Sequence, residues 1–155
     1  LLLYTYDMEA WVAREFVKGP TARGIPLHER LPAFINVLTQ TWATVNPNGR
    51  LWWEPWELSA GQIYACIPSL PKNNFGMALH SNITEVQLTR PVDVWFMNMC
   101  NLLADKNIPV IAEIFMSGAT EETEPLQNIF APRLVFEEFE ALYGVQKISG
   151  VKEYY

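Results

Sequence analysis

Apolar residues follow two different spacings along the chain, and segments of the two kinds alternate. Short continuous apolar runs are typical of strands that are buried on both faces of a parallel sheet. Longer segments with apolar residues every three or four positions predict amphipathic helices. The predicted strands are Leu1–Glu9, Leu51–Ser59, Phe75–Ile83, Ile108–Met116 and Lys147–Glu153, and the predicted helices are Pro26–Val45, Ala60–Ser69, Pro91–Lys106 and Pro132–Tyr143.

The alternation of strands and helices predicts an α/β fold with a parallel sheet and right-handed crossovers. The 155 residues suit a single α/β unit, residues 1–155, with a substantial core. The sequence opens inside one predicted strand and ends as another finishes, so we expect a fragment of a larger domain. A complete five-stranded flavodoxin-like open sheet fits the length and the number of βα units as an alternative.

The second predicted strand, LWWEPWELS, combines three tryptophans with two glutamates. Pro55 argues against a helix and limits the strand, because proline lacks the backbone donor that either ladder uses. Side chains alternate along a strand, so Trp53 faces one way, whereas Trp52, Glu54 and Trp56 face the other. Flat aromatic faces beside carboxylates suit a cleft for a ring-shaped, hydroxylated ligand. The alternative is an ordinary aromatic strand end whose glutamates point into water.

Polar and aromatic side chains gather at the carboxyl end of every predicted strand, whereas the amino ends carry little chemistry. Parallel α/β folds bind their ligands at the carboxyl edge of the sheet. The candidate site residues in chain order are Asp7, Glu9 and Trp11, then Glu54, Trp56 and Glu57, then His80 and Asn82, then Glu113, and finally Glu153 and Tyr154; Trp52 joins them from the tryptophan strand.

Glu113 lies within the apolar run VIAEIFM. An acidic residue there costs several kcal/mol unless it is solvated or paired. An open site at the sheet edge would solvate the carboxylate. A basic neighbour, or a structural partnership with His80, would account for it without any function.

Asp7 and Glu9 form a D-x-E pair whose carboxylates point the same way in a strand. Paired carboxylates can split their pKa values, so that one of them becomes an acid. The alternative is a solvated strand exit with Glu9 near Arg14. His80 and Asn82 share one strand face and suit hydrogen bonds to a hydroxyl-rich ligand, although a lone histidine is also common as a satisfied structural residue.

Composition excludes several classes of function. The formal net charge is −6 and no basic run occurs, which argues against nucleic acid and anionic membrane surfaces as partners. No apolar run approaches the length of a membrane span. Cys66 and Cys100 lie in apolar surroundings and are expected to be buried free thiols, which leaves the compartment open.

No cofactor motif is present. The chain lacks a glycine-rich phosphate loop, a G-x-S-x-G elbow and a dinucleotide fingerprint. Two distant histidines and no cysteine pair at ligand spacing argue against zinc. We therefore expect no cofactor and no metal site, with an oxygen-only calcium site left open.

The pattern resembles part of a (β/α)8-barrel glycoside hydrolase, through its strand-end acids and the tryptophans and tyrosine beside them. As architecture the resemblance spans the whole chain, but it covers about five of the eight βα units of such a barrel. It implies the C-terminal part of the barrel, a carbohydrate substrate, and hydrolysis by a protonated carboxyl with a second supporting carboxylate. The remainder of the barrel, or a self-association partner, would cover the exposed sheet edges.

The resemblance allows several placements of the catalytic pair. Many barrel glycosidases carry the acid/base after the fourth strand and the nucleophile after the seventh, which would assign Glu9 and Glu113, although Met8 stands where many such enzymes have asparagine. Glu153 with Glu54 or Glu57 is a second pair at the same separation. The D-x-E pair also looks like that of substrate-assisted hexosaminidases and chitinases. The rivals from other classes are a non-catalytic carbohydrate-binding domain and a purely structural α/β piece.

Overall fold

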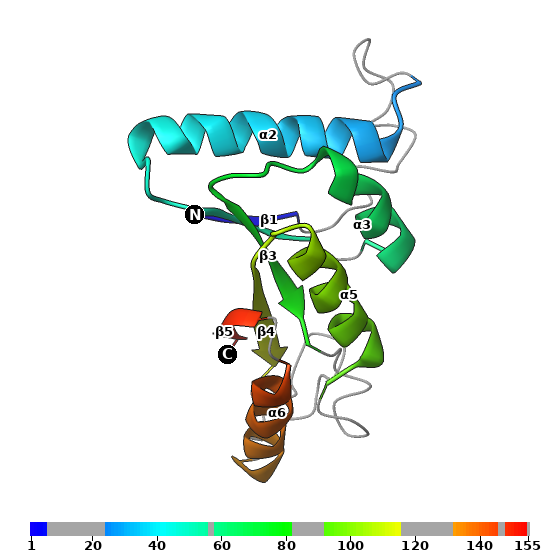
Figure 1. Cartoon of the computed structure of the whole chain (residues 1–155), viewed down its shortest axis with the longest axis vertical. Helices are drawn as coiled ribbons and strands as arrows, with labels where there is room; N and C mark the ends of the chain where they lie inside the picture. The colour runs from blue at the N-terminus through cyan, green and yellow to red at the C-terminus, as the bar shows by residue number, and fades with distance from the viewer. Residues whose placement is uncertain (6–23, 56–57, 82–91, 116–131, 146–147, 155) are drawn as a thin grey trace, which may run out of the picture. The chain divides into compact units, whose positions relative to one another are not determined.

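The computed structural model contains the predicted alternation of strands and helices (Figure 1). It describes residues 1–5, 24–55, 58–81, 92–115, 132–145 and 148–154. The elements are β1 (Leu2–Tyr4), α2 (Leu27–Val45), β2 (Leu51–Glu54), α3 (Ala60–Cys66), the 3-10 helix η2 (Ile67–Ser69), β3 (Phe75–His80), α5 (Val94–Asp105), β4 (Val110–Phe115), α6 (Pro132–Gly144) and β5 (Ile148–Tyr154).

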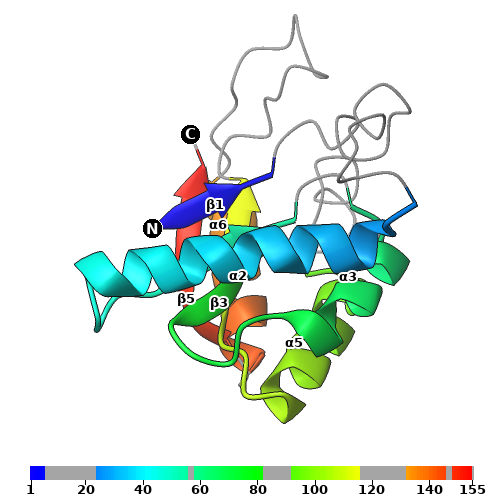
Figure 2. The same cartoon turned by 90° about the horizontal axis from the view of Figure 1, so that it is seen from above.

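The strands form a five-stranded sheet in the order β1-β2-β3-β4-β5, which is the order of the chain. The pairs β1/β2, β2/β3 and β4/β5 are parallel, and Figure 2 shows the arrows of β4 and β5 pointing the same way. Each parallel connection contains a helix, because a parallel strand can be reached only by a crossover. The predicted α/β fold with parallel βα repeats is therefore confirmed.

The backbone divides into two compact units, Leu1–Met77 and Ala78–Tyr155. The division falls inside β3, so both units contain part of that strand. In the described part of the chain, no helix combines the length with the apolar character needed to cross a membrane.

In the first unit, α2 packs against α3, η2 and β2. Leu31 and Ile35 lie one helical turn apart on α2 and are fully buried. Pro32 stands between them, and the sequence predicts that it kinks the helix or marks its start. The helix begins at Leu27, directly after Pro26, and continues through Pro32, so Pro32 does not mark its start. Because proline has no N–H to donate, the helix passes Pro32 with one backbone hydrogen bond fewer than a regular turn would have.

The strand β2 ends at Glu54, immediately before Pro55, as the missing donor of proline predicts. Ser59 then begins α3 with a capping box: its hydroxyl accepts from the backbone N–H of Gln62, and the Gln62 side chain accepts from the Ser59 N–H. This reciprocal pair satisfies two donors that the helix itself leaves open.

Asn74 braces the turn that enters β3. Its φ of 54° lies in the left-handed region, which asparagine tolerates better than most residues. The side-chain amide donates to the carbonyl oxygens of Pro47 at 2.7 Å and Gly49 at 2.8 Å. Its own carbonyl accepts from the N–H of Leu51 at 2.8 Å. One residue thus joins the turn before β2 to the start of β3.

In the second unit, α5 starts at Val94 and not at Pro91, because Asp93 caps it. The Asp93 carboxylate accepts from the N–H of Trp95 at 3.0 Å, the arrangement preferred at a helix N-terminus. The helix contacts β4. Four of its residues form the buried stripe, namely Phe96, Met99, Cys100 and Leu103.

The strand β4 is buried along most of its length. Val110, Ala112 and Ile114 point to one face and are fully buried, and Glu113 between them is fully buried as well. Burial of successive residues is expected for a strand inside a parallel sheet, whose two faces are both covered. Glu113 is therefore a carboxylate in the interior of this unit.

Candidate functional site

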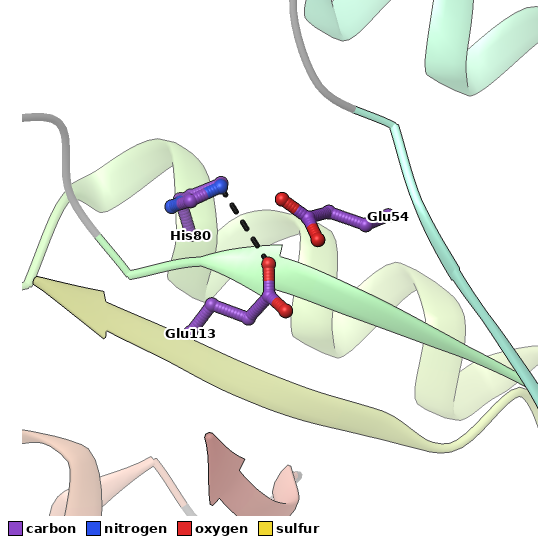
Figure 3. Close-up of side chains that lie close together, drawn as sticks. All are labelled: Glu54, His80 and Glu113. Carbon is purple, nitrogen blue, oxygen red and sulfur yellow. Dashed lines mark ion pairs between the residues drawn. The ribbon is translucent and has the colours of Figure 1, made fainter. Parts of the chain in front are cut away.

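The site in the second unit centres on Glu113 and His80. Glu113 is the fourth residue of β4, and His80 ends β3. Their Oε2 and Nε2 atoms lie 3.5 Å apart, as the dashed line in Figure 3 marks. The side chain of Glu113 is fully buried, whereas 12% of the His80 side chain is exposed. The predicted alternative of a partnership between these two residues is the arrangement observed.

Ser81 joins this pair to a second buried carboxylate. Its N–H donates to the carbonyl oxygen of Glu113 at 2.9 Å. Its hydroxyl donates to Oε1 of Glu138 at 2.7 Å and also lies 3.2 Å from the Glu113 carbonyl oxygen. Ser81 and Glu138 are both buried. The ends of β3 and β4 are thus connected to α6 through polar groups inside the unit.

Glu138 has no place among the residues that the sequence nominates. It stands four residues before Leu142 on α6, and both are about 1% exposed. Residues four apart share one face of a helix, so a glutamate on the apolar stripe of an amphipathic helix is the signal that identifies it. Phe136 and Tyr143, by contrast, are exposed on the same helix.

The His80–Glu113 pair can perform acid–base chemistry. A carboxylate beside an imidazole stabilises the imidazolium form and fixes the orientation of the ring. Protons can reach the buried carboxyl group through the imidazole, because His80 is the partly exposed member of the pair. A carboxylate and an imidazole are also residue types that bind divalent metal ions, and by themselves they provide two of the three protein ligands usual in a catalytic zinc site.

Glu54 is the third residue labelled in Figure 3 and belongs to the first unit. It ends β2 and is fully buried, as a strand-end acid in a closed environment. Its carbonyl oxygen accepts from both the N–H of Thr5, at 3.2 Å, and the Thr5 hydroxyl, at 2.9 Å. The backbone of Glu54 is therefore fixed by β1.

The tryptophans of β2 have two different environments. Trp53 is fully buried, and its indole N–H donates to the Thr5 hydroxyl at 3.2 Å. It belongs to the core of the first unit. Trp52 is half-buried and the Arg50 guanidinium lies 5.2 Å from the centre of its ring. The opposite facing of these two residues is the alternation predicted from the sequence.

Several nominated residues lie outside the described part of the chain, and the side chains of two others are not described. The first group comprises Asp7, Glu9, Trp11, Trp56, Glu57 and Asn82, and the second comprises Glu153 and Tyr154. The structure brings together His80 and Glu113 from the nominated set, and it adds Ser81 and Glu138 to them.

Cys66 and Cys100 are buried free thiols, as the sequence predicts. Burial raises the pKa of Cys66 to about 11 and that of Cys100 to about 12, because the charged thiolate would lose its hydration. Neither thiol is a nucleophile at neutral pH, since the thiolate is the reactive form.

Comparisons with known proteins found no match. No protein-family model matches the chain, and no curated protein or solved structure matches it either.

Proposed function

We propose that the chain contributes βα units to a (β/α)8-barrel glycoside hydrolase, and that Glu113 is one of the two carboxyl groups that hydrolyse its carbohydrate substrate. The observation that carries the proposal is the Glu113–His80 pair: a fully buried carboxylate held 3.5 Å from an imidazole that reaches solvent. Such a carboxylate is costly to keep in an interior unless it is paired, and acid–base catalysis gives the cost a purpose.

The order of the strands supports the barrel. Successive strands of a (β/α)8 barrel are neighbours in the sheet, and the order β1-β2-β3-β4-β5 is of this kind. A flavodoxin-like sheet has the order 2-1-3-4-5, in which the chain reverses direction across the sheet. The barrel would also place the carboxyl ends of β3 and β4, with His80 and Glu113, on its catalytic face.

In the proposed reaction, Glu113 donates a proton to the leaving oxygen or supports the oxocarbenium-like centre. His80 exchanges protons with water and holds the Glu113 carboxyl group in one orientation. The second carboxyl group comes from another strand end, with Glu9 as the candidate that the sequence pairs with Glu113.

The test measures hydrolysis of a panel of α- and β-linked aryl glycosides by the full chain, together with oligosaccharide binding followed by tryptophan emission. Glu113→Gln is expected to lower kcat by a factor of about 100 or more, the usual contribution of a general acid or base. Glu9→Gln tests the second group. Glu137→Gln is the matched control, because Glu137 is a partly exposed glutamate that pairs with Arg133 on the surface of α6.

Each outcome decides between the classes of function. Turnover that Glu113→Gln abolishes and Glu137→Gln preserves supports the proposal, and it does so only if addition of EDTA leaves the rate unchanged. Binding without turnover favours a non-catalytic carbohydrate-binding domain and overturns the hydrolase. If the chain shows no binding and no turnover, the carbohydrate proposal as a whole is overturned.

A further inference from the structure

Glu138 is connected to the acid–base pair through Ser81. The connection uses three buried residues from three elements: Glu113 on β4, Ser81 directly after β3, and Glu138 on α6. The hydroxyl of Ser81 is 2.7 Å from Oε1 of Glu138. A hydrogen bond to a carboxylate at this distance is among the stronger ones in proteins.

Ser81 is held at three different atoms. Its N–H donates to the carbonyl oxygen of Glu113, its carbonyl accepts from the N–H of Asp93 at 2.8 Å, and its hydroxyl donates to Glu138. The first contact fixes the backbone from which the Glu113 side chain projects. His80 precedes Ser81 in the chain, so the same residue also limits the backbone of His80. Both members of the acid–base pair therefore depend on the position of Ser81.

We propose that Glu138 is a positioning residue: by binding the Ser81 hydroxyl, it keeps His80 and Glu113 at the separation that their acid–base chemistry requires. The inference deepens the proposed function, because it concerns the same site. A carboxylate on a helix face that is otherwise apolar is expensive, and this role explains why α6 carries one there.

The direct readout is the NMR signals of the His80 ring protons at one fixed pH. The chain has two histidines, and the exposed His28 is an internal reference in the first unit. When Glu113 moves away from the imidazole, the surroundings of these ring protons change. Glu138→Ala and Ser81→Ala are therefore expected to shift the ring-proton signals of His80, whereas those of His28 stay in place.

Matched variants separate position from charge. Glu138→Gln removes the charge but keeps an oxygen that accepts from Ser81, and Ser81→Thr keeps the hydroxyl, so both are expected to retain the His80 signals of wild type. Glu140→Ala removes an exposed glutamate from the same helix and is expected to have no effect. Should Glu138→Ala fail to fold, Glu138→Asp replaces it, because a shorter side chain with the same charge no longer reaches the hydroxyl.

The results have distinct meanings. If Glu138→Gln shifts the His80 signals as far as Glu138→Ala does, the effect is one of charge and the positioning role is refuted. Unchanged His80 signals in every folded variant refute it too, and leave Glu138 a structural residue. Because this NMR measurement requires no substrate, it reports on positioning even if the glycosidase assay is negative. If that assay is positive, kcat is expected to fall about tenfold or more with Glu138→Ala while KM changes little.

Discussion

His80 and Glu113 face each other from neighbouring strand ends, and only the histidine reaches solvent. Glu113 is fully buried, so an uncompensated charge would destabilise the fold more on Glu113 than on His80. A pair of this kind couples the stability of the second unit to both side chains.

Breaking the pair should therefore destabilise the fold in a coupled way. We expect His80→Gln and Glu113→Gln each to lower the free energy of unfolding by about 1–3 kcal/mol. Each substitution removes the imidazole or carboxylate that the buried polar atom of the other residue faces. The double variant should cost less than the sum of the two by about 1 kcal/mol. Urea unfolding of the four proteins measures this coupling. The exposed Arg133–Glu137 pair is the control and should show no measurable coupling; additive effects at His80 and Glu113 would contradict the prediction.

Thr5, directly after β1, should contribute more to the stability of the first unit than the short strand suggests. Its hydroxyl accepts from the Trp53 indole and donates to the Glu54 carbonyl, and all three groups are buried. Thr5→Val keeps the shape of the side chain but removes both bonds, and we expect a loss of about 1–3 kcal/mol because a buried indole N–H is left unpaired. Thr39→Val is the matched control, since the buried Thr39 hydroxyl bonds only within its own helix to Ile35.

The measurement for Thr5→Val is urea unfolding followed by tryptophan emission. Loss of the hydrogen bond at Trp53 should also change the emission of the folded protein. If Thr5→Val and Thr39→Val have the same midpoint of unfolding, the bond between Thr5 and Trp53 contributes nothing beyond packing.

The buried thiols should make stability fall at alkaline pH. Their folded pKa values, about 11 for Cys66 and about 12 for Cys100, lie above the ordinary thiol value of 9.0. The unfolded chain therefore loses these protons first, and the thiols' contribution to stability, complete below pH 9, is lost as pH rises through the folded values. Urea unfolding at pH 8 and pH 10 should show the decline, and Cys100→Ala should make it shallower.

The same burial predicts slow chemistry in the folded chain. An aromatic disulfide reagent at pH 8 should label both thiols only after urea is added, because the folded protein keeps them protonated and covered. Rapid labelling without urea would show that the two side chains open to solvent far more often than their burial implies.

The alternation of elements was predictable because each strand and helix has its own apolar spacing. The beginning of α3 could be anticipated from Ser59 as a cap, and the end of β2 from Pro55, since both effects are local. The start of α5 was predicted three residues too early, because Pro91 was read as a first-turn residue and Asp93, a preferred N-cap residue, was overlooked.

The site was predictable only residue by residue. Glu113 attracts attention as an acid within an apolar strand, but its partner depends on how β3 and β4 are aligned, which no local pattern specifies. His80 was one of several alternatives. Glu138 was not predicted, because an amphipathic helix tolerates an occasional polar residue on its buried face. Its role is indicated only by the contact with Ser81, which the sequence does not show.

The side-chain amide of Asn74 holds two segments of the first unit together. Its amide nitrogen donates to two carbonyl oxygens, those of Pro47 and Gly49. Hydrolysis of that amide to a carboxylate would replace one nitrogen by oxygen and turn both attractions into repulsions between acceptors. A protein in which this amide has become a carboxylate should therefore lose the link between the turn before β2 and the entry to β3.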